Sequence, residues 1–194
     1  MRRISNDSEA VRSALLAAED RFVQAWGQMA GAWGVSRTMA EAHALLYIVG
    51  EPRNTDEVME RLRISRGNAS MTLRALVDWG LISRVHKRGD RKEYFAAERD
   101  VWAMLGALLR ERKKRELNPL LVALHEIRDE TGAIPGEPAE QHRARLDAML
   151  GFIGAIDRIA DRMIAMSAGE LREATHALTA LADGLDAHAK GGAS

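Results

Sequence analysis

The amino-acid sequence predicts a mainly α-helical protein whose helices are interrupted by one short β-hairpin. Apolar residues recur at three- and four-residue steps along most of the chain, which is the spacing of one helical face. Between residues 81 and 97 this period gives way to two short runs of β-branched and aromatic residues around a glycine-containing turn. Basic side chains concentrate around this hairpin and just before it, which indicates that the segment has a role beyond packing.

The composition is that of a globular chain without thiol chemistry. Of its 194 residues 46% are hydrophobic, which is enough for a core, and none is cysteine. The lack of cysteine excludes disulfides, cysteine nucleophiles and cysteine-ligated metals. No apolar run approaches the roughly 18 residues that span a bilayer, and polar residues 5–9 stand where a signal peptide would be apolar. We therefore expect a cytoplasmic protein with no membrane partner.

The first segment, 1–36, is expected to be a dimerisation helix. Asn6 or Asp7 can cap a helix that continues to about Trp33, because its apolar positions step by four and three. Gly34 follows where a helix commonly ends in a left-handed residue.

Residues 37–99 are expected to form a separate module that begins with two helices. A helix is predicted over 37–49, since Gly50 follows it. Asn54, with Glu57 three residues later, predicts a capping box at the start of a short helix that ends at Leu62.

A third helix of this module is predicted from its cap, Ser65, to Trp79, with Gly80 as the left-handed residue that ends it. One face of this helix is apolar and the opposite face is polar or basic. The apolar face holds Ala69, Thr72, Leu73 and Leu76, and the other face holds Arg66, Gly67, Ser70, Met71 and Arg74. After Gly80 a hairpin is expected, with strands over 81–86 and 92–97 and a basic turn over 87–91.

The rest of the chain is predicted to be helical. Asp100 caps a linker helix over 100–130, which we expect to break at Asn118–Pro119 because proline lacks a backbone donor. The Gly- and Pro-containing loop 131–138 is predicted to be the main boundary of the chain.

Beyond that loop the sequence predicts a helical hairpin over 139–190 and a tail over 191–194. Narrow apolar seams run along 146–163 and 171–188, which is typical of helices that pair with other helices within or between chains. We expect this hairpin to contribute to a homodimer. A second capping box is expected at Ser167 to Glu170.

Charge is distributed unevenly along a chain whose net charge is zero. Residues 61–92 contain nine basic and two acidic side chains, and the rest of the chain is acidic to the same extent. A basic segment in an acidic body is typical of a nucleic-acid-binding module, although a solvated face is the alternative. The order of a helix, a tight turn, a second helix with a basic outer face and a basic hairpin favours a winged helix-turn-helix that binds double-stranded DNA.

The residues of this module resemble a known family. The segments that carry the resemblance are 55–62, Ile64–Met71, Trp79–Leu81 and Gly89–Phe95. They are similar to the GbsR branch of the MarR-type transcriptional regulators, most specifically over residues 50–105. The resemblance implies a homodimeric repressor with a winged helix, terminal helices that dimerise, and an effector pocket between the two parts. Members of this branch respond to choline or glycine betaine, but no residue in the matching stretch indicates that effector here.

The candidate DNA-binding residues come from the third helix of the module and from the hairpin turn. They are Ser65, Arg66, Gly67, Asn68, Ser70, Met71, Arg74, Lys87, Arg88, Asp90, Arg91 and Lys92. The pair Asp90-Arg91 resembles the family's motif at the tip of the hairpin, which implies that Arg91 enters the minor groove and Asp90 orients basic side chains; an ordinary polar turn is the alternative. Met71 stands where many MarR-type sequences carry arginine.

Four aromatic residues are candidates for an effector pocket between the helices and the DNA-binding module. A quaternary ammonium is bound by aromatic ring faces, and Phe22, Trp26, Trp33 and Trp102 could supply them. The alternative, which is the better supported, is that they are large core residues.

No enzyme, cofactor or metal site is expected. His125-Glu126 lacks the second histidine of a zinc-protease motif, and no serine-centred elbow or glycine-rich phosphate loop is present. The sequence therefore favours a sequence-specific regulator that binds a palindromic operator and is released by a small effector. The alternatives are a DNA-architectural protein with little sequence preference and a pure protein-interaction module.

Overall fold

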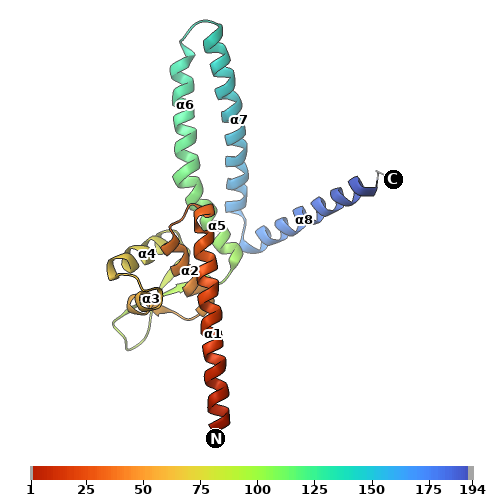
Figure 1. Ribbon diagram of the computed structural model, residues 1–194. Helices are drawn as coiled ribbons and strands as arrows, with labels where there is room; N and C mark the ends of the chain where they lie inside the picture. The colour runs from red at the N-terminus through yellow and green to blue at the C-terminus, as the bar shows by residue number, and fades with distance from the viewer. Residues whose placement is uncertain (1, 192–194) are drawn as a thin grey trace. The chain divides into compact units, whose positions relative to one another are not determined.

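The computed structural model describes the backbone of residues 2–191 and the side chains of residues 9–32 and 34–184. The chain forms two compact units, Met1–Arg99 and Asp100–Ser194. Helices α1 to α4 and a three-stranded sheet belong to the first unit, and helices α5 to α8 belong to the second (Figure 1).

The first helix, α1 (Arg2–Met29), is longer than the sequence predicts. Asn6 and Asp7 lie within it rather than at its cap, because a polar residue inside a helix costs only about 0.7 kcal/mol or less relative to alanine. The helix ends in a 3-10 turn, η1 (Ala30–Trp33), and Gly34 adopts the left-handed conformation expected of a C-cap, with φ of 60°.

α1 packs along α2 (Arg37–Val49) through a small apolar cluster. Val23 of α1 is buried against Ala44 and Leu45 of α2, and Phe22 and Trp26 add partly buried rings to the same cluster. The prediction of α2 is confirmed, and the helix ends at Gly50, whose φ is 71°.

The short helix α3 (Thr55–Leu62) begins with the expected capping box. The Oδ1 of Asn54 accepts a hydrogen bond of 3.1 Å from the backbone N–H of Glu57, and a Glu57 carboxylate oxygen accepts one of 2.7 Å from the N–H of Asn54. The turn after α3 contains Arg63, which takes the left-handed conformation at φ 54° and redirects the chain toward α4. This pair of helices and its tight turn form the predicted helix-turn-helix.

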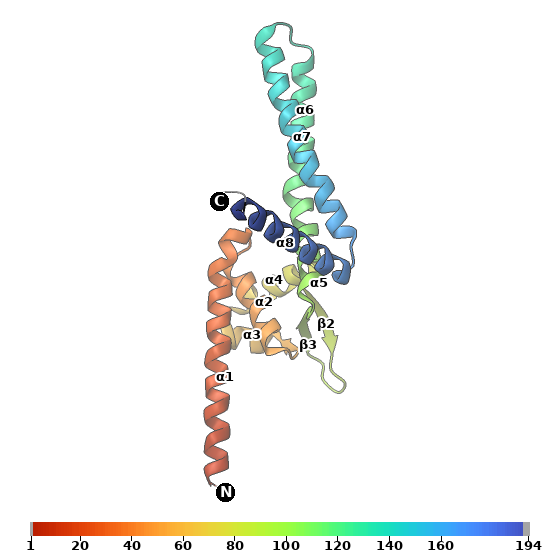
Figure 2. The ribbon, with the colours of Figure 1, turned by 90° about the vertical axis from the view of Figure 1, so that its right-hand side faces the viewer.

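α4 (Arg66–Asp78) is followed by the expected hairpin, strands β2 (Ile82–His86) and β3 (Glu93–Ala97), which pair antiparallel (Figure 2). We call this hairpin with its turn, residues 82–97, the wing. A third strand, β1 (Arg53–Asn54), pairs with β3 and gives the sheet order β1-β3-β2. The sequence did not predict β1, because two residues are too few to show an alternating pattern. Through β1 the wing is attached to the start of α3.

The core of the first unit lies under α4 and the wing. Leu46, Val58, Leu73 and Leu76 come from three different helices and are at most 1% exposed. The apolar face of α4 is therefore buried as predicted, which leaves its opposite face at the surface.

The second unit starts with α5 (Val101–Arg112), capped by Asp100 as expected. The helix does not break at Asn118–Pro119: it continues through a π-helical segment, η2 (Lys113–Leu117), into α6 (Asn118–Gly132). Asn118 keeps helical dihedral angles and donates its N–H to the carbonyl of Lys113, five residues back. This wider turn shifts the hydrogen-bond pattern just before Pro119, which has no N–H to donate, so the chain stays helical.

α7 (Glu137–Ala165) packs against α6, so the loop before α7 joins two helices of one unit (Figures 1 and 2). The expectation of a main boundary at 131–138 is therefore wrong; the division falls between Arg99 and Asp100. An ion pair of 2.8 Å between Arg128 and Asp147 joins α6 to α7, and Arg143 of α7 donates to two carbonyls at the end of α6 and in the loop.

The expected helical hairpin over 139–190 is also wrong within the part of the chain that the structure describes. α7 pairs with α6, whereas α8 (Ala168–Gly191) begins against α5, where Leu171 is 2% exposed. The capping box at the start of α8 is confirmed, because Ser167 and Glu170 exchange hydrogen bonds. Of the expected tail, Gly191 is the last residue of α8, and residues 192–194 lie outside the described residues.

Among the described helices, none has both the length and the apolar character that crossing a membrane requires.

Candidate nucleic-acid interface

The exposed face of α4 is built around its N-terminus. The hydroxyl of Ser65 caps the helix by accepting a hydrogen bond of 3.3 Å from the N–H of Asn68. Of the candidate residues on or next to this helix, Asn68 and Ser70 are half-buried and the others are exposed. The exposed ones are Ser65, Arg66, Gly67, Met71 and Arg74.

Two of these side chains are oriented by bonds within the helix. The Nε of Arg74 donates to the carbonyl of Ser70 at 3.2 Å, which leaves the terminal nitrogens of the guanidinium for a ligand. The Oδ1 of Asn68 accepts from the hydroxyl of Thr72 at 3.3 Å, so its amide NH₂ is the part that remains to donate. The face of α4 therefore presents donors near its N-terminus and a cation one turn further along.

The turn of the wing presents a second set of exposed side chains, all from residues 87–92. Gly89 has a φ of 85°, a conformation that favours glycine, and it follows Arg88 at the tip. The side chains of Arg88 and Arg91 have no hydrogen bond or ion pair to any other residue that the structure describes, so both are available to a ligand.

Lys87 and Asp90 are held against the body of the wing by Tyr94. The Nζ of Lys87 lies 3.9 Å from the centroid of the Tyr94 ring and donates to the carbonyl of Pro52 at 3.3 Å. Asp90 accepts hydrogen bonds from the N–H of Lys92 and from the Tyr94 hydroxyl, which lower the pKa of its carboxyl. The resemblance implies that Asp90 orients basic side chains, but neither of these two hydrogen bonds comes from a basic side chain. Both bonds order the turn.

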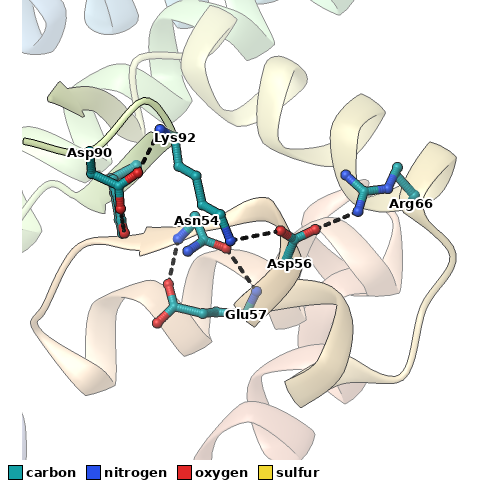
Figure 3. A network of polar contacts seen from close by, with 7 residues as sticks. Asn54, Asp56, Glu57, Arg66, Asp90 and Lys92 are labelled. Carbon is teal, nitrogen blue, oxygen red and sulfur yellow. Dashed lines mark hydrogen bonds and ion pairs between the residues drawn. The ribbon is translucent and has the colours of Figure 1, made fainter. Parts of the chain in front are cut away.

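Asp56, in the first turn of α3, contacts two of the candidate basic side chains (Figure 3). One of its oxygens accepts from Arg66 at 2.6 Å, and the other accepts from Lys92 at 3.2 Å. The bond from Lys92 and the charge of Arg66 hold the pKa of Asp56 below its ordinary value, and the same bond raises the pKa of Lys92.

Sequence reasoning missed Asp56. Its neighbours in space are 10 and 36 residues away along the chain, so no spacing rule for a helix or strand connects them. The local pattern around Asp56 indicates only an acidic residue in a first helical turn, which the helix dipole favours whatever its neighbours in space.

The expected aromatic pocket stays a prediction. Phe22 and Trp26 stack at a centroid distance of 5.8 Å within the first unit, and Phe22 also lies 6.4 Å from Tyr47. Trp102 belongs to the second unit, where its ring lies 6.4 Å from that of His176. The side chain of Trp33 lies outside the described residues.

No metal site is formed by the described residues, since they contain no group of three His, Asp or Glu side chains in ligating positions. The chemistry present at the α4–wing surface is that of hydrogen-bond donors and exposed cations. This is the chemistry that recognises phosphates and base edges.

A helix-turn-helix followed by a basic β-hairpin on a three-stranded sheet defines a winged-helix protein. Residues 33–93 match the sequence model of the MarR family. The predicted resemblance to MarR-type regulators of the GbsR branch is thereby confirmed, together with the mainly helical winged-helix fold.

Two curated proteins of Bacillus subtilis (strain 168) are similar to the chain. The HTH-type transcriptional regulator YvaV is 25% identical over 85 residues, which cover 44% of this chain and 48% of YvaV. The HTH-type transcriptional repressor GbsR is 24% identical over 114 residues, which cover 59% of this chain and 63% of GbsR. The chain thus spans less than two thirds of the length of each relative, and both relatives are regulators rather than enzymes.

One solved structure supports the fold. A crystal structure of a transcriptional regulator aligns with a TM-score of 0.60 at 23% identity, covering 76% of this chain and 95% of its own.

Proposed function

We propose that this protein is a transcriptional regulator that binds double-stranded DNA with sequence specificity. The observation that carries the proposal is the exposed face of α4 beside the basic wing. An α-helix fits the major groove, where the donors of Arg66, Asn68 and Arg74 can reach base edges and phosphates. Arg88 and Arg91 at the wing tip would contact phosphates or the minor groove, whose negative potential attracts cations.

We infer further that the protein acts as a homodimer on a palindromic operator. Support comes from apolar side chains that the single chain leaves uncovered on α7, where Phe152 is 61% and Ile159 60% exposed. A single chain rarely leaves such a stripe open to water unless another surface covers it. A two-fold dimer would present two α4 helices to half-sites about one helical turn apart.

Repression relieved by a small effector is the mode of regulation that we propose. It is supported by the similarity to GbsR, whose name states that it is a repressor. A choline- or betaine-like effector belongs to the same proposal, and the stacked rings of Phe22 and Trp26 are the candidates in the first unit for binding its cation.

The test is selection from a pool of random duplexes that are long enough for two half-sites. Affinity is then measured for the selected duplex and for a scrambled duplex of equal length and composition, at several salt concentrations. We expect a palindromic consensus and a preference for the selected duplex of at least about 10³-fold. If selection yields no consensus and the two duplexes bind alike, the protein is an architectural DNA-binding protein. If neither duplex binds at any salt concentration, it is an interaction module.

A further inference from the structure

Two cationic side chains from different parts of the module meet at the exposed carboxylate of Asp56. Asp56 lies on α3, Arg66 lies at the N-terminus of α4, and Lys92 lies in the turn of the wing, just before β3 (Figure 3). The side chains are 44%, 69% and 55% exposed, respectively, so each can still reach a ligand in solvent. A guanidinium has five N–H donors and an ammonium has three, and the two cations donate one each to Asp56. Most donors of both cations therefore remain for DNA.

We propose that Asp56 is a positioning residue that sets the sequence selectivity of DNA binding, by holding Arg66 of α4 and Lys92 of the wing in one fixed arrangement. The inference rests on the proposed function, because it concerns how the same surface distinguishes one duplex from another. The arrangement couples the element that would enter the major groove to the element that would flank it.

The carboxylate has two opposite effects on DNA binding. Its negative charge opposes phosphates, and this cost applies to every duplex whatever its sequence. Its hydrogen bonds hold two long side chains in place before DNA arrives, which reduces the conformational freedom that they lose on binding. That gain is obtained only on a duplex whose base edges and phosphates match the fixed arrangement. Asp56 therefore weakens binding to unmatched DNA and preserves binding to the matched sequence.

A purely structural role for these contacts is disfavoured by their exposure. Ion pairs between exposed side chains contribute little to folding stability, whereas α3 and α4 already pack against each other, and each contributes a buried apolar side chain, Val58 and Leu73, to the core. Removing the carboxylate should therefore leave the module folded, which makes a binding experiment informative.

The test compares Asp56→Asn with a matched control, Asp78→Asn. Both substitutions remove one exposed carboxylate from the same unit, but Asp78 lies at the far end of α4 from Arg66. Affinity is measured for the selected and scrambled duplexes across a range of salt concentrations. We expect Asp56→Asn to bind the scrambled duplex more tightly and to lose selectivity by about tenfold, the order expected for two side chains that are no longer held in place. Asp78→Asn should leave the selectivity unchanged, and Asp56→Glu should restore part of what Asp56→Asn loses.

A second measurement tests the arrangement without DNA. The carboxyl resonance of Asp56 is titrated by NMR in the parent, in Arg66→Gln and in Lys92→Gln. We expect Asp56 to titrate below the usual range of an aspartate in the parent and closer to that range in both variants. A normal titration in the parent would show that the two cations are not held in solution, which would overturn the proposal.

The outcomes separate this inference from the proposed function. If the parent does not distinguish the selected from the scrambled duplex, the proposed function fails, and the positioning role fails with it. If the parent is selective but Asp56→Asn changes both affinities by the same factor, as Asp78→Asn is expected to do, the proposed function stands. In that case Asp56 is only a nearby charge, and the proposal is overturned.

Discussion

The hydroxyl of Tyr94 donates a hydrogen bond of 2.7 Å to the carboxylate of Asp90, and this bond attaches the tip of the wing to the body of the module. Tyr94 is 8% exposed and Asp90 is exposed, so the bond joins a side chain anchored in the sheet to the solvent-facing turn. The same ring lies under the ammonium of Lys87. One aromatic residue thus orders the two ends of the basic turn.

We expect Tyr94→Phe to loosen the turn while keeping the ring in place. The variant should bind the selected and scrambled duplexes more weakly by a similar factor, because we propose that the cations at the tip of the turn contact phosphates or the minor groove, which carry little sequence information. The pKa of Asp90 should rise toward its ordinary value, since the variant lacks one of the hydrogen bonds that lower it. DNA affinity and an NMR titration of Asp90 measure the two effects.

Tyr47→Phe is the matched control, because the Tyr47 hydroxyl has no hydrogen bond to a residue that the structure describes. It should leave both measurements unchanged. An unaltered titration of Asp90 in Tyr94→Phe would contradict the assigned role of Tyr94.

α4 and the wing tip should contribute differently to DNA binding. Arg74→Gln should cost about 1–3 kcal/mol on the selected duplex and much less on a scrambled one, because the proposed role of Arg74 is to contact base edges. Arg88→Gln should weaken binding to both duplexes alike and reduce the slope of log affinity against log salt by roughly 0.9 for each phosphate that the variant no longer neutralises. Binding titrations at several salt concentrations measure both.

Lys114→Gln is the control for charge, since it removes one exposed cation of the second unit. If Arg66, Asn68, Ser70 and Arg74 variants all change selected and scrambled binding equally, the protein does not read sequence through α4.

Folding stability should fall in mild acid because of His43. Its side chain is 5% exposed, its Nε2 has no hydrogen-bond partner among the described residues, and burial lowers its pKa from 6.5 to about 4. Below pH 6.5 the unfolded chain binds a proton at His43 that the folded chain does not bind until about pH 4. The stability that this neutral histidine contributes is therefore present above pH 6.5 and is lost as the pH falls toward 4, by about 3 kcal/mol in total.

Urea denaturation at a series of pH values measures this loss. His43→Leu should have a flatter stability profile between pH 6.5 and 4, whereas His86→Gln, a change of an exposed histidine on β2, should keep the parent profile. Equal profiles in the parent and in His43→Leu would contradict the prediction.

The exposed apolar side chains of α7 should hold the proposed dimer together. Met149, Phe152, Ile156 and Ile159 follow one another at three- and four-residue steps and are 39–61% exposed. Replacing Phe152 and Ile159 together with glutamine should shift the protein from dimer to monomer in analytical ultracentrifugation. It should also weaken binding to a palindromic duplex far more than binding to a single half-site.

Leu178 and Leu181 of α8 are similarly exposed, so the replacement of both by glutamine provides the comparison. A dimer that survives both pairs of substitutions would show that another surface forms the interface.

Features that depend on neighbouring residues along the chain were predictable from the sequence. The capping boxes at Asn54 and Ser167 and the left-handed glycines 34, 50 and 80 are examples, because their hydrogen bonds and φ angles involve residues only a few positions apart. The hairpin and the two faces of α4 were predictable for the same reason.

The pairing of distant segments required the tertiary structure. Pro119 is a local signal for a helix break, but the π-helical turn before it keeps the helix continuous. Likewise, α7 carries an apolar seam that could pair with any of several helices of the chain. Ion pairs to Arg128 of α6 and Lys113 of η2 accompany its packing on that long helix rather than on α8.

The candidate nucleic-acid interface shows the same division. Which residues of α4 and the wing face solvent follows from periodicity and charge, so all the candidate residues could be named before any contact was known. Two contacts depend on how α3, α4 and the wing fold together. Asp56 joins Arg66 to Lys92. Asp90 accepts a hydrogen bond from Tyr94 and none from a basic side chain that the structure describes. Such contacts join residues far apart in sequence, and their geometry is set by the packing of the core beneath them, which no local pattern encodes.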